Sequence, residues 1–470
     1  MSRYVVLVKY LIVFLLFRGT VLVGAVLDIL CTTDLHGHFE KMPQIAFITR
    51  SFSRNALRID AGDTLTGTFY SDLCHGQIMI ELLNKLDFDV WVPGNHDFEV
   101  GFYPLEKQIR AFRGTVLGAQ WHWNNIRPLK WKMFKRNGIR AAVIGATDPA
   151  MFKRCLPGID GGFDDLIKNL NKLAPEIFAA APDVVILAVH NGLYARYAGV
   201  VSLANACPWI NLFLGGHSHQ EVWGRKVKHS YFVQAGCHGN GVAHVSVKFD
   251  PDTKKILRIE SEFIPVDNNK KDPEIDRYCR RISAISKKLS GRKITDPAQK
   301  LRLPADRREY SALGEGTVRL LMQTAGADAA MFLLPLVRTK DDIRRKYAVT
   351  DGDLYRLFPY RNRLCSVKIT RADLDELEMY IADYSKKRKV RFFFAGALKC
   401  DSRGKFSLDR ESVKIALSDF LLFQIPVLQR KLSMEPGSWR LIPGLFERDV
   451  VRQALENGLF PAGLDHSVSR

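Results

Sequence analysis

Short apolar runs, each ending in polar residues, recur through the first half of the chain. An unbroken run such as residues 184–189 is typical of a strand buried on both faces of a parallel sheet. Such strands are predicted at residues 26–32, 57–59, 88–92, 141–145, 184–189 and 212–214. Residues 77–86 instead space their apolar side chains as one face of a helix. Residues 231–249 are expected to form a hairpin or a pair of strands. This alternation predicts a layered α/β domain that extends to about residue 265.

The pattern changes beyond residue 265. Residues 273–289 place apolar side chains on one face of a basic helix, and Ser290-Gly291 ends it. Further helix and strand patterns follow at residues 311–323, 329–334, 364–369 and 371–382. We therefore expect a first domain at 26–265, a linker helix region at 266–300 and a smaller α/β domain at 301–470.

The first 25 residues have the pattern of a secretory leader. Arg3 and Lys9 precede the apolar run 10–17, and Val23-Gly24-Ala25 offers small residues for cleavage. The unbroken run is short for a membrane-spanning helix, which favours a cleaved leader over an uncleaved N-terminal anchor. We expect a periplasmic or extracellular protein, with membrane attachment only if the leader is retained.

Charge and cysteine content narrow the classes of partner. The formal net charge is +19, which suits anionic substrates, anionic lipid or nucleic acid. No nucleic-acid fold signature accompanies the basic runs, so specific nucleic-acid binding is not expected. The eight cysteines include no Cys-x-x-Cys pair, which argues against a cysteine-based zinc site.

Metal-ligand residues follow five of the predicted strands. The candidate ligands are Asp34, His36, Asp63, Asn95, His190, His217 and His219. This mixed nitrogen and oxygen set suits two divalent ions, zinc, manganese, iron or cobalt, more than calcium. A single carboxylate can bridge two ions, and Asp63 is the natural choice. Two ions about 3.5–4 Å apart clamp a phosphoryl group and activate a water as hydroxide.

The remaining ligands divide between the two ions. Asp34, His36 and His219 are assigned to one ion, and Asn95, His190 and His217 to the other. Residues two apart in an extended segment point the same way, so His217 and His219 can each serve one ion of a close pair. A histidine taken singly is more often structural or exposed, and His38, His122 and His238 are left in that class.

These residues carry a resemblance. The stretches Thr33-Asp34-Leu35-His36-Gly37, Gly62-Asp63, Gly94-Asn95-His96-Asp97, His190 and Gly216-His217-Ser218-His219 resemble the calcineurin-like metallophosphoesterases. The leader and the second domain narrow the resemblance to the 5'-nucleotidase family, which includes UDP-sugar hydrolases and 2',3'-cyclic nucleotide phosphodiesterases. The resemblance implies a four-layered α/β/β/α domain and a substrate-binding domain that rotates against it.

The resemblance also implies roles for two residues beside the metals. His96 corresponds to a histidine that is not a ligand and that stabilises the transition state or protonates the leaving group. The family holds this histidine with an acid three residues on, usually Asp, and here that position is Glu99. Asn95 is expected to contact substrate as well as metal.

The second domain departs from the family pattern. Of the Asn-Gly-Gly-x-Arg loop that recognises nucleotides only Arg338 remains, and it can still grip phosphate by a bidentate contact. Arg391 stands at the first base-stacking position and Phe420 at the second, while Pro426 replaces a late Asp. A base can stack on Phe420 and on the Arg391 guanidinium. The alternative is structural: residues 392–394 form an apolar strand and Phe420 is a core residue.

The leading hypothesis is a secreted dimetal phosphoesterase that hydrolyses nucleoside phosphates through a metal-bridging hydroxide. The same metals also suit four alternative reactions: nucleotide-sugar hydrolysis, 2',3'-cyclic nucleotide hydrolysis, nucleic-acid processing and the sulfur–sulfur cleavage of a related branch. An alternative of another class is a catalytically idle anion-binding or adhesion protein, which the basic charge and the altered substrate loops favour.

Overall fold

The computed structural model describes residues 25–456 except 124–125, 148–160, 196–197, 295–308, 335–348, 360–361, 389–390, 402–403 and 435–436. The predicted leader lies outside these ranges apart from Ala25, and so does Arg338. Within the described ranges, no helix combines the length and apolarity needed to cross a bilayer. The seven cysteines described there are all free thiols.

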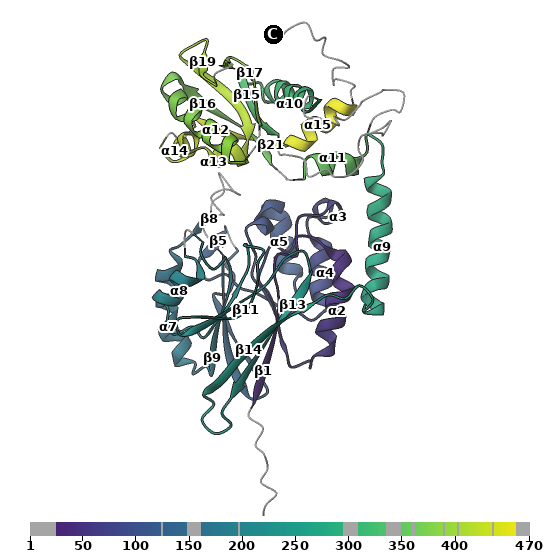
Figure 1. Ribbon diagram of the computed structural model, residues 1–470, viewed down its shortest axis with the longest axis vertical. Helices are drawn as coiled ribbons and strands as arrows, with labels where there is room; N and C mark the ends of the chain where they lie inside the picture. Colours follow the sequence, from purple (N-terminus) through teal and green to yellow (C-terminus); the bar gives the residue numbers. More distant parts are fainter. Residues whose placement is uncertain are drawn as a thin grey trace, which may run out of the picture.

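Two six-stranded sheets form the body of the first domain (Figure 1). The first sheet has the order β14 (Ile256–Pro265), β13 (Gly241–Phe249), β1 (Val26–Thr32), β2 (Leu57–Asp60), β3 (Val90–Trp91) and β4 (Thr115–Val116). The second has the order β11 (Glu221–Val227), β12 (Ser230–Ala235), β10 (Leu212–Gly215), β9 (Val184–His190), β7 (Ile139–Thr147) and β6 (Trp131–Arg136). Strands β1 to β4 are parallel, and so are β7, β9, β10 and β12. The carboxyl ends of parallel strands therefore meet along one edge of each sheet.

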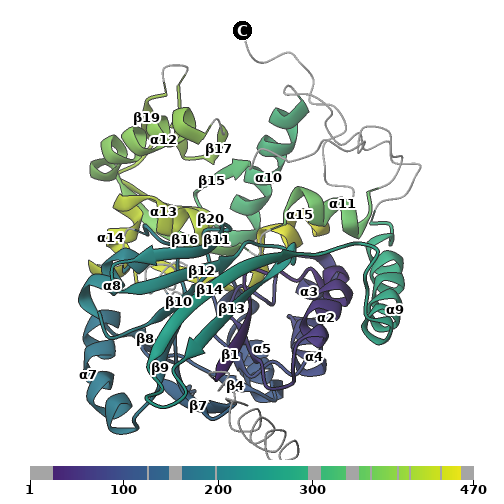
Figure 2. The ribbon, with the colours of Figure 1, turned by 60° about the horizontal axis from the view of Figure 1, so that its bottom comes forward.

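Helices cover the outer face of each sheet. The first sheet is covered by α2 (Met42–Ser51), α4 (Gln77–Lys85), α5 (Phe102–Ala111) and α9 (Pro273–Ser290), and the second by α7 (Leu166–Ala179) and α8 (Val200–Ala206). Figure 2 shows the two helical flanks on either side of the sheets. A third apolar core fills the space between the sheets, where Ile29 of β1 and Ile186 of β9 are fully buried. The order helix, sheet, sheet, helix confirms the predicted four layers.

Alternation of side chains explains why these strands read as unbroken apolar runs. In β1, Ile29 and Cys31 belong to the core between the sheets, while Leu30 packs under the helices. Both faces are thus buried, as parallel sheets require. Hydrophobic burial on both faces of both sheets fixes the register of each strand, because a slip by one residue would exchange the two faces.

Residues 231–249 form a pair of strands and not a hairpin. Strand β12 lies in the second sheet beside β10, and β13 pairs antiparallel with β1 in the first sheet. Residues 236–240 therefore cross from one sheet to the other at the carboxyl edge of the parallel strands. This crossing loop brings His238 to that edge.

A second α/β body follows helix α9. Its five-stranded sheet has the order β17 (Arg391–Gly396), β15 (Ala329–Leu334), β20 (Ser412–Ser418), β16 (Arg363–Thr370) and β21 (Trp439–Phe446). One face packs on α12 (Leu374–Arg388), α13 (Asp419–Gln424) and α14 (Pro426–Met434), and the other on α10 (Glu309–Ala325), α11 (Asp351–Leu357) and α15 (Glu447–Glu456). This arrangement confirms the predicted smaller α/β domain. The predicted boundaries at residues 265 and 301 stay a prediction.

Helix α9 connects the two bodies and is fixed at its start. The Asp272 carboxylate accepts hydrogen bonds from the backbone N–H groups of Glu274 and Ile275, and Pro273 occupies the first turn. These are features of a stable helix N-terminus. The helix runs along the flank of the first body toward the second (Figure 1). A direct contact also joins the bodies, because the Tyr355 hydroxyl of α11 donates to Asp72 Oδ2 over 3.1 Å.

Candidate metal centre

Both sheets deliver the predicted ligands to one edge. Asp34 and His36 follow β1, Asp63 follows β2, Asn95 follows β3, His190 ends β9, and His217 and His219 follow β10. These are the carboxyl ends of parallel strands, where open α/β sheets place their ligand sites. The contacts described below bring all seven residues into one cluster.

The backbone at this edge is unusual for residues with a Cβ. Five of the seven predicted ligands adopt left-handed φ angles: Asp34 (51°), His36 (46°), Asp63 (55°), His217 (68°) and His219 (58°). Such angles cost free energy in residues other than glycine and concentrate at functional sites. Two glycines permit the close approach of these loops. A Cβ on Gly94 would lie 2.3 Å from Asp63 Oδ1, and one on Gly216 would lie 2.7 Å from His190 Nδ1.

His190 presents the strongest indication of a cation. Its Nδ1 lies 2.7 Å from the carbonyl oxygen of Ala61, which can only accept, so Nδ1 carries the proton. The lone pair of Nε2 then faces Asp63 Oδ2 at 3.0 Å. Nε2 is buried and has no hydrogen-bond partner in the described structure. Two acceptor atoms in this position need a positive charge between them.

Electrostatics in the site lead to the same conclusion. Burial alone would lower the pKa of His190, but the carboxylates of Asp63 and Asp34 outweigh burial and raise it to about 9. The site therefore attracts positive charge to Nε2. Zinc bonds of about 2.0–2.2 Å to nitrogen and oxygen place two tetrahedral ligands about 3.3 Å apart, close to the observed separation.

Two more donors lie beside this pair. Asn95 Oδ1 is 3.0 Å from His217 Nδ1. The Asn95 amide nitrogen is buried and also lacks a hydrogen-bond partner in the described structure. Asp63, His190 and His217 have ligand atoms within 4.8 Å of one another. With Asn95 they form the set that the sequence assigns to one of the two ions together with the bridging Asp63.

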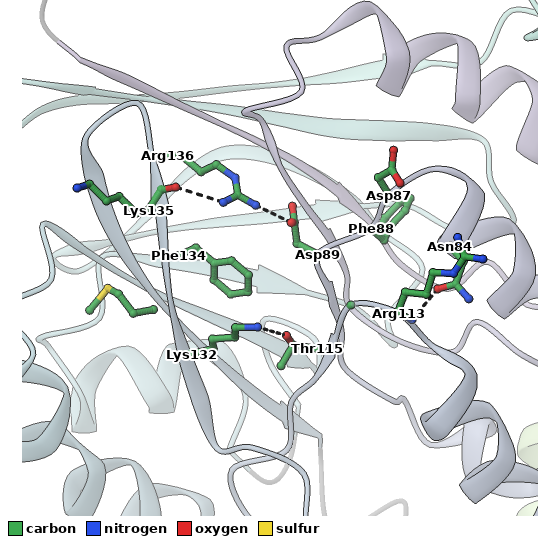
Figure 3. Close-up of a pocket in the computed structure, with 12 residues that line it drawn as sticks. Asn84, Asp87, Phe88, Asp89, Arg113, Thr115, Lys132, Phe134, Lys135 and Arg136 are labelled. Carbon is green, nitrogen blue, oxygen red and sulfur yellow. Dashed lines mark hydrogen bonds and ion pairs between the residues drawn. The ribbon is translucent and has the colours of Figure 1, made fainter.

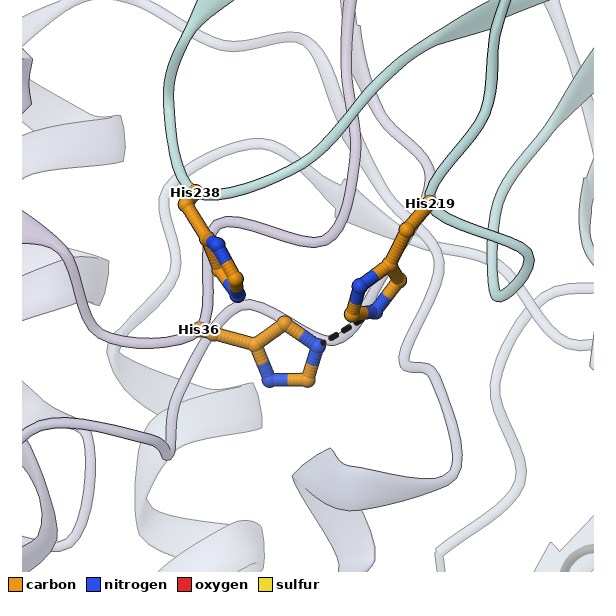
Figure 4. A group of neighbouring side chains, drawn as sticks. All are labelled: His36, His219 and His238. Carbon is orange, nitrogen blue, oxygen red and sulfur yellow. Dashed lines mark hydrogen bonds between the residues drawn. The ribbon is translucent and has the colours of Figure 1, made fainter. Parts of the chain in front are cut away.

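The other predicted ligands converge in the same way. His36 Nε2 lies 3.1 Å from His219 Nε2 (Figure 4), and His219 Nε2 lies 3.5 Å from Asp34 Oδ1. His36 Nε2 is 3.8 Å from Asp63 Oδ2, the carboxylate that also faces His190. The Thr66 carbonyl, 3.3 Å from His36 Nδ1, directs the lone pair of Nε2 into the site. Asp34, His36 and His219 form the set that the sequence assigns to the other ion.

The pKa shifts of the candidate ligands differ from residue to residue. Burial raises the pKa of Asp34, His190 opposes this, and the pKa rises to about 7. Burial would also raise the pKa of Asp63, but the surrounding histidines, His190 first, hold it well below its usual range. Burial lowers the pKa of His36 to about 3 and that of His217 to about 4. Both imidazoles are thus neutral near pH 7, as metal ligation requires.

His96 and Glu99 lie as the family resemblance implies. His96 Nδ1 is 2.8 Å from Glu99 Oε1, so the longer side chain of Glu does reach the imidazole. Burial would lower the pKa of His96, but Glu99 and Asp63 outweigh it and raise the pKa to about 10. Its ring centroid is 5.2 Å from that of His36, and its backbone N–H donates to Asp63 Oδ1 over 2.7 Å. These two carboxylates therefore favour the protonated imidazole of His96 beside the candidate metal ligands.

Two buried carboxylates that the sequence did not single out hold the ligand loops. Asp97 accepts hydrogen bonds of 2.7–2.8 Å from the backbone N–H groups of Thr64, Leu65 and Gly94. Asp60 accepts from the Thr32 hydroxyl at 2.6 Å and from the Gly62 N–H at 3.1 Å. Each fixes the loop that carries Asp63. The sequence signal for Asp60 is its place in Asp60-Ala61-Gly62-Asp63, but sequence alone does not distinguish a ligand from a support.

The predicted substrate residues of the second domain are less well defined. Arg391 begins strand β17, and the expected apolar strand at 392–394 is found there. Phe420 lies in α13 with 37 % of its surface exposed, so it is not a fully buried core residue. Burial raises the pKa of the neighbouring Asp419 to about 6, Arg363 opposes this, and the Glu99 carboxylate of the first domain adds to the rise.

A groove of about 510 Å³ lies away from these residues (Figure 3). It is lined by residues that precede β3, by the start of β4 and by β6, near the opposite edge of the sheets. Two of its cations are engaged: Arg136 pairs with Asp89 at 2.6 Å, and Lys132 donates to Thr115 at 2.8 Å. None of the predicted ligands lines it, and its position does not match the carboxyl edge where α/β sheets bind ligands.

Comparison with known proteins agrees with this geometry. Residues 27–221 match the family model of calcineurin-like phosphoesterases. Endonuclease YhcR of Bacillus subtilis is 24 % identical over 357 residues, covering 69 % of this chain and 28 % of its own length. Protein UshA of Yersinia enterocolitica is 23 % identical over 437 residues, covering 77 % of this chain and 76 % of its own length. The chain thus spans less than a third of the endonuclease.

A solved structure extends the likeness to the whole chain. The 5'-nucleotidase precursor from Thermus thermophilus has a TM-score of 0.66 at 18 % identity, covering 94 % of this chain and 98 % of that one. At this low sequence identity, the structural match establishes a shared fold and nothing more. The fold and the clustered donors define a calcineurin-like phosphoesterase, a class of metal-dependent phosphoester hydrolases. Within that class, the relatives and the solved structure support the 5'-nucleotidase family, as the resemblance implied.

Proposed function

We propose that this protein is a dimetal phosphoesterase that hydrolyses small nucleotide-like phosphate esters, with a nucleoside 5'-phosphate as the leading substrate. The observation that carries the proposal is the contact between His190 Nε2 and Asp63 Oδ2, two acceptor atoms 3.0 Å apart in a buried site. A cation between them satisfies both atoms. The same carboxylate lies 3.8 Å from His36 Nε2, which supports a bridging role for Asp63.

The donor set fits two divalent ions of the zinc, manganese, iron or cobalt type. Asp63 would bridge them, with Asp34, His36 and His219 on the outer ion and Asn95, His190 and His217 on the inner ion. Bound in this way, such ions polarise phosphoryl oxygens and lower the pKa of a water. Ala61 and Thr66 support the ligands by holding the tautomers of His190 and His36.

His96 would act on the leaving group. With Nδ1 engaged by Glu99, its Nε2 carries the proton available for donation. The raised pKa, about 10, keeps His96 in its acid form at neutral pH. Glu99 is a positioning residue, since it orients the ring and maintains its charge. The buried Asn95 amide N–H can donate to a phosphoryl oxygen of the substrate.

The second domain would supply the contacts to the rest of the substrate. Phe420 is partly exposed on α13, and an aromatic ring there suits a nucleobase. Arg391 and Arg338 are the proposed contacts to base and phosphate. A cleaved leader would place the enzyme in the periplasm or outside the cell, where it would act on nucleotides.

A substrate panel on metal-reconstituted protein tests the proposal. Nucleoside monophosphates, nucleotide sugars, 2',3'-cyclic nucleotides and single-stranded DNA are incubated with protein that has been stripped with chelator and reloaded with zinc, manganese, iron or cobalt. We expect metal-dependent phosphate release, fastest from a nucleoside 5'-phosphate. Absence of hydrolysis across the panel with every metal would overturn the proposal and favour an anion-binding protein.

A further inference from the structure

One more histidine lies beside the proposed outer ion. His238 sits in the crossing loop 236–240 that follows β12, and sequence reasoning placed it among structural or exposed histidines. Its ring centroid is 5.4 Å from that of His219 and 5.6 Å from that of His36. One ring nitrogen of each residue lies within 4.8 Å of the other two. Figure 4 shows the three rings around a common centre.

The backbone fixes His238 in this position. Its φ of 55° lies in the left-handed region, as for five of the predicted ligands. Its N–H donates to the carbonyl oxygen of Asp34 over 2.7 Å, which ties the crossing loop to the ligand loop after β1. Glycine or asparagine adopts this conformation at lower cost. A histidine here is therefore held against the metal cluster despite the backbone strain.

We propose that His238 is a third imidazole donor to the outer ion. This inference rests on the proposed metal site. The outer ion would then have His36, His219 and His238 together with carboxylate oxygens from Asp34 and Asp63, while the inner ion keeps two imidazoles. A nitrogen-rich set favours zinc, cobalt or nickel over manganese and magnesium. The outer site would accordingly bind its ion more tightly than the inner site and discriminate more strongly between metals.

The competing explanation is that His238 only packs against its neighbours. His38 provides the comparison, because its ring lies 4.7 Å from that of His238. His38 Nδ1 is 2.6 Å from Glu40 Oε1, and His38 does not belong to the three-nitrogen group. A substitution at His38 therefore perturbs the same ring cluster without removing a proposed ligand.

The test compares three variants of the full chain: His238→Asn, His238→Phe and His38→Asn. Asparagine retains the left-handed backbone, and phenylalanine retains the ring volume. Each metal-free protein is titrated with zinc, manganese and cobalt, and a chromophoric chelator reports the affinity of each equivalent. The visible spectrum of the cobalt protein reports coordination number. Thermal unfolding of each metal-free variant reports folding.

We expect the wild type to bind two equivalents. Both His238 variants should bind one equivalent at least about tenfold more weakly, by more for zinc than for manganese, and leave the other unchanged. Their cobalt spectra should change, whereas His38→Asn should match the wild type. Unchanged affinities and spectra in either His238 variant, or an equal loss in His38→Asn, would overturn the inference. A wild type that binds no divalent ion would instead refute the proposed function itself.

Discussion

The two halves of the molecule hold their functional candidates in different ways. In the first domain the ligand loops are fixed by buried carboxylates, by hydrogen bonds between loops and by left-handed backbone angles. In the second domain Phe420 lies partly exposed on a six-residue helix. Metal binding depends on the positions of the donor atoms to within fractions of an ångström. Stacking of a base on an aromatic side chain tolerates small shifts and the replacement of one aromatic residue by another. The first half therefore fixes its candidate residues more closely than the second half does.

Substitution of Asp63, the proposed bridging carboxylate, should have the largest effect on activity. A small effect would contradict the comparison between the two halves. In Asp63→Asn a neutral amide replaces the proposed bridge with little change in shape. We expect kcat/KM to fall by about 10³-fold or more, because charge stabilisation by the ions is lost, and metal content to fall below two ions per chain. Phosphate release and atomic absorption measure the two effects. His229→Ala, on the exposed turn after β11, is the matched control. Full activity in Asp63→Asn would refute the assignment of this carboxylate.

Loss of the His96 partner should have the next largest effect. In Glu99→Gln the carboxylate that helps to raise the pKa of His96 to about 10 is gone, so that pKa falls. The acid form is then lost at lower pH, and the alkaline limb of the kcat profile should move to lower pH. We expect kcat near pH 8 to fall by about 10–100-fold, within the range of general acid catalysis. Glu99→Asp should restore part of the activity. An unmoved alkaline limb would show that His96 is not the titrating acid.

Truncation of the aromatic ring in the second domain should have a smaller effect, confined to binding. Stacking of one base on an aromatic side chain contributes about 1–3 kcal/mol. Phe420→Ala should therefore raise KM for a nucleoside monophosphate roughly tenfold while kcat changes little. An aryl phosphate without a nucleobase serves as the control substrate, and its KM should stay constant. Equal effects on both substrates would mean that Phe420 supports the fold and not the base.

The fold and the candidate ligands of the first domain could be predicted from the sequence because the patterns that specify them are local. Each apolar run ends in its ligands, and the parallel arrangement then brings those strand ends together. The sequence did not place β12 and β13 in different sheets, because hydrophobic periodicity does not specify a strand's neighbours. For the same reason it missed His238, whose crossing loop meets Asp34 about 200 residues away in the chain. In the second domain Arg391 and Phe420 were identified by resemblance only, and no local pattern distinguishes a substrate contact from a strand end or a core ring.

The buried Glu447 of the second domain extends the comparison to the stability of the protein. Burial raises the pKa of the Glu447 carboxyl from its ordinary 4.5 to about 7. Between these pH values the native state binds more protons than the unfolded state, so stability falls as pH rises through this window and levels off above it. Glu447→Gln keeps the hydrogen bond from Asn362 Nδ2, now 2.9 Å from Glu447 Oε2, and cannot ionise.

The variant should therefore match the wild type near pH 4.5 and unfold with a free energy higher by on the order of 1–3 kcal/mol at pH 8, since each pKa unit corresponds to about 1.4 kcal/mol. Urea denaturation across this pH range measures the difference, and Glu456→Gln at the exposed end of the same helix is the control. Unchanged hydrolysis in Glu447→Gln would show that this buried carboxyl serves packing alone, unlike the buried carboxyls of the first domain that are proposed to bind metal. Loss of activity without gain of stability would instead assign Glu447 to the residues that contact substrate and remove the contrast between the two halves.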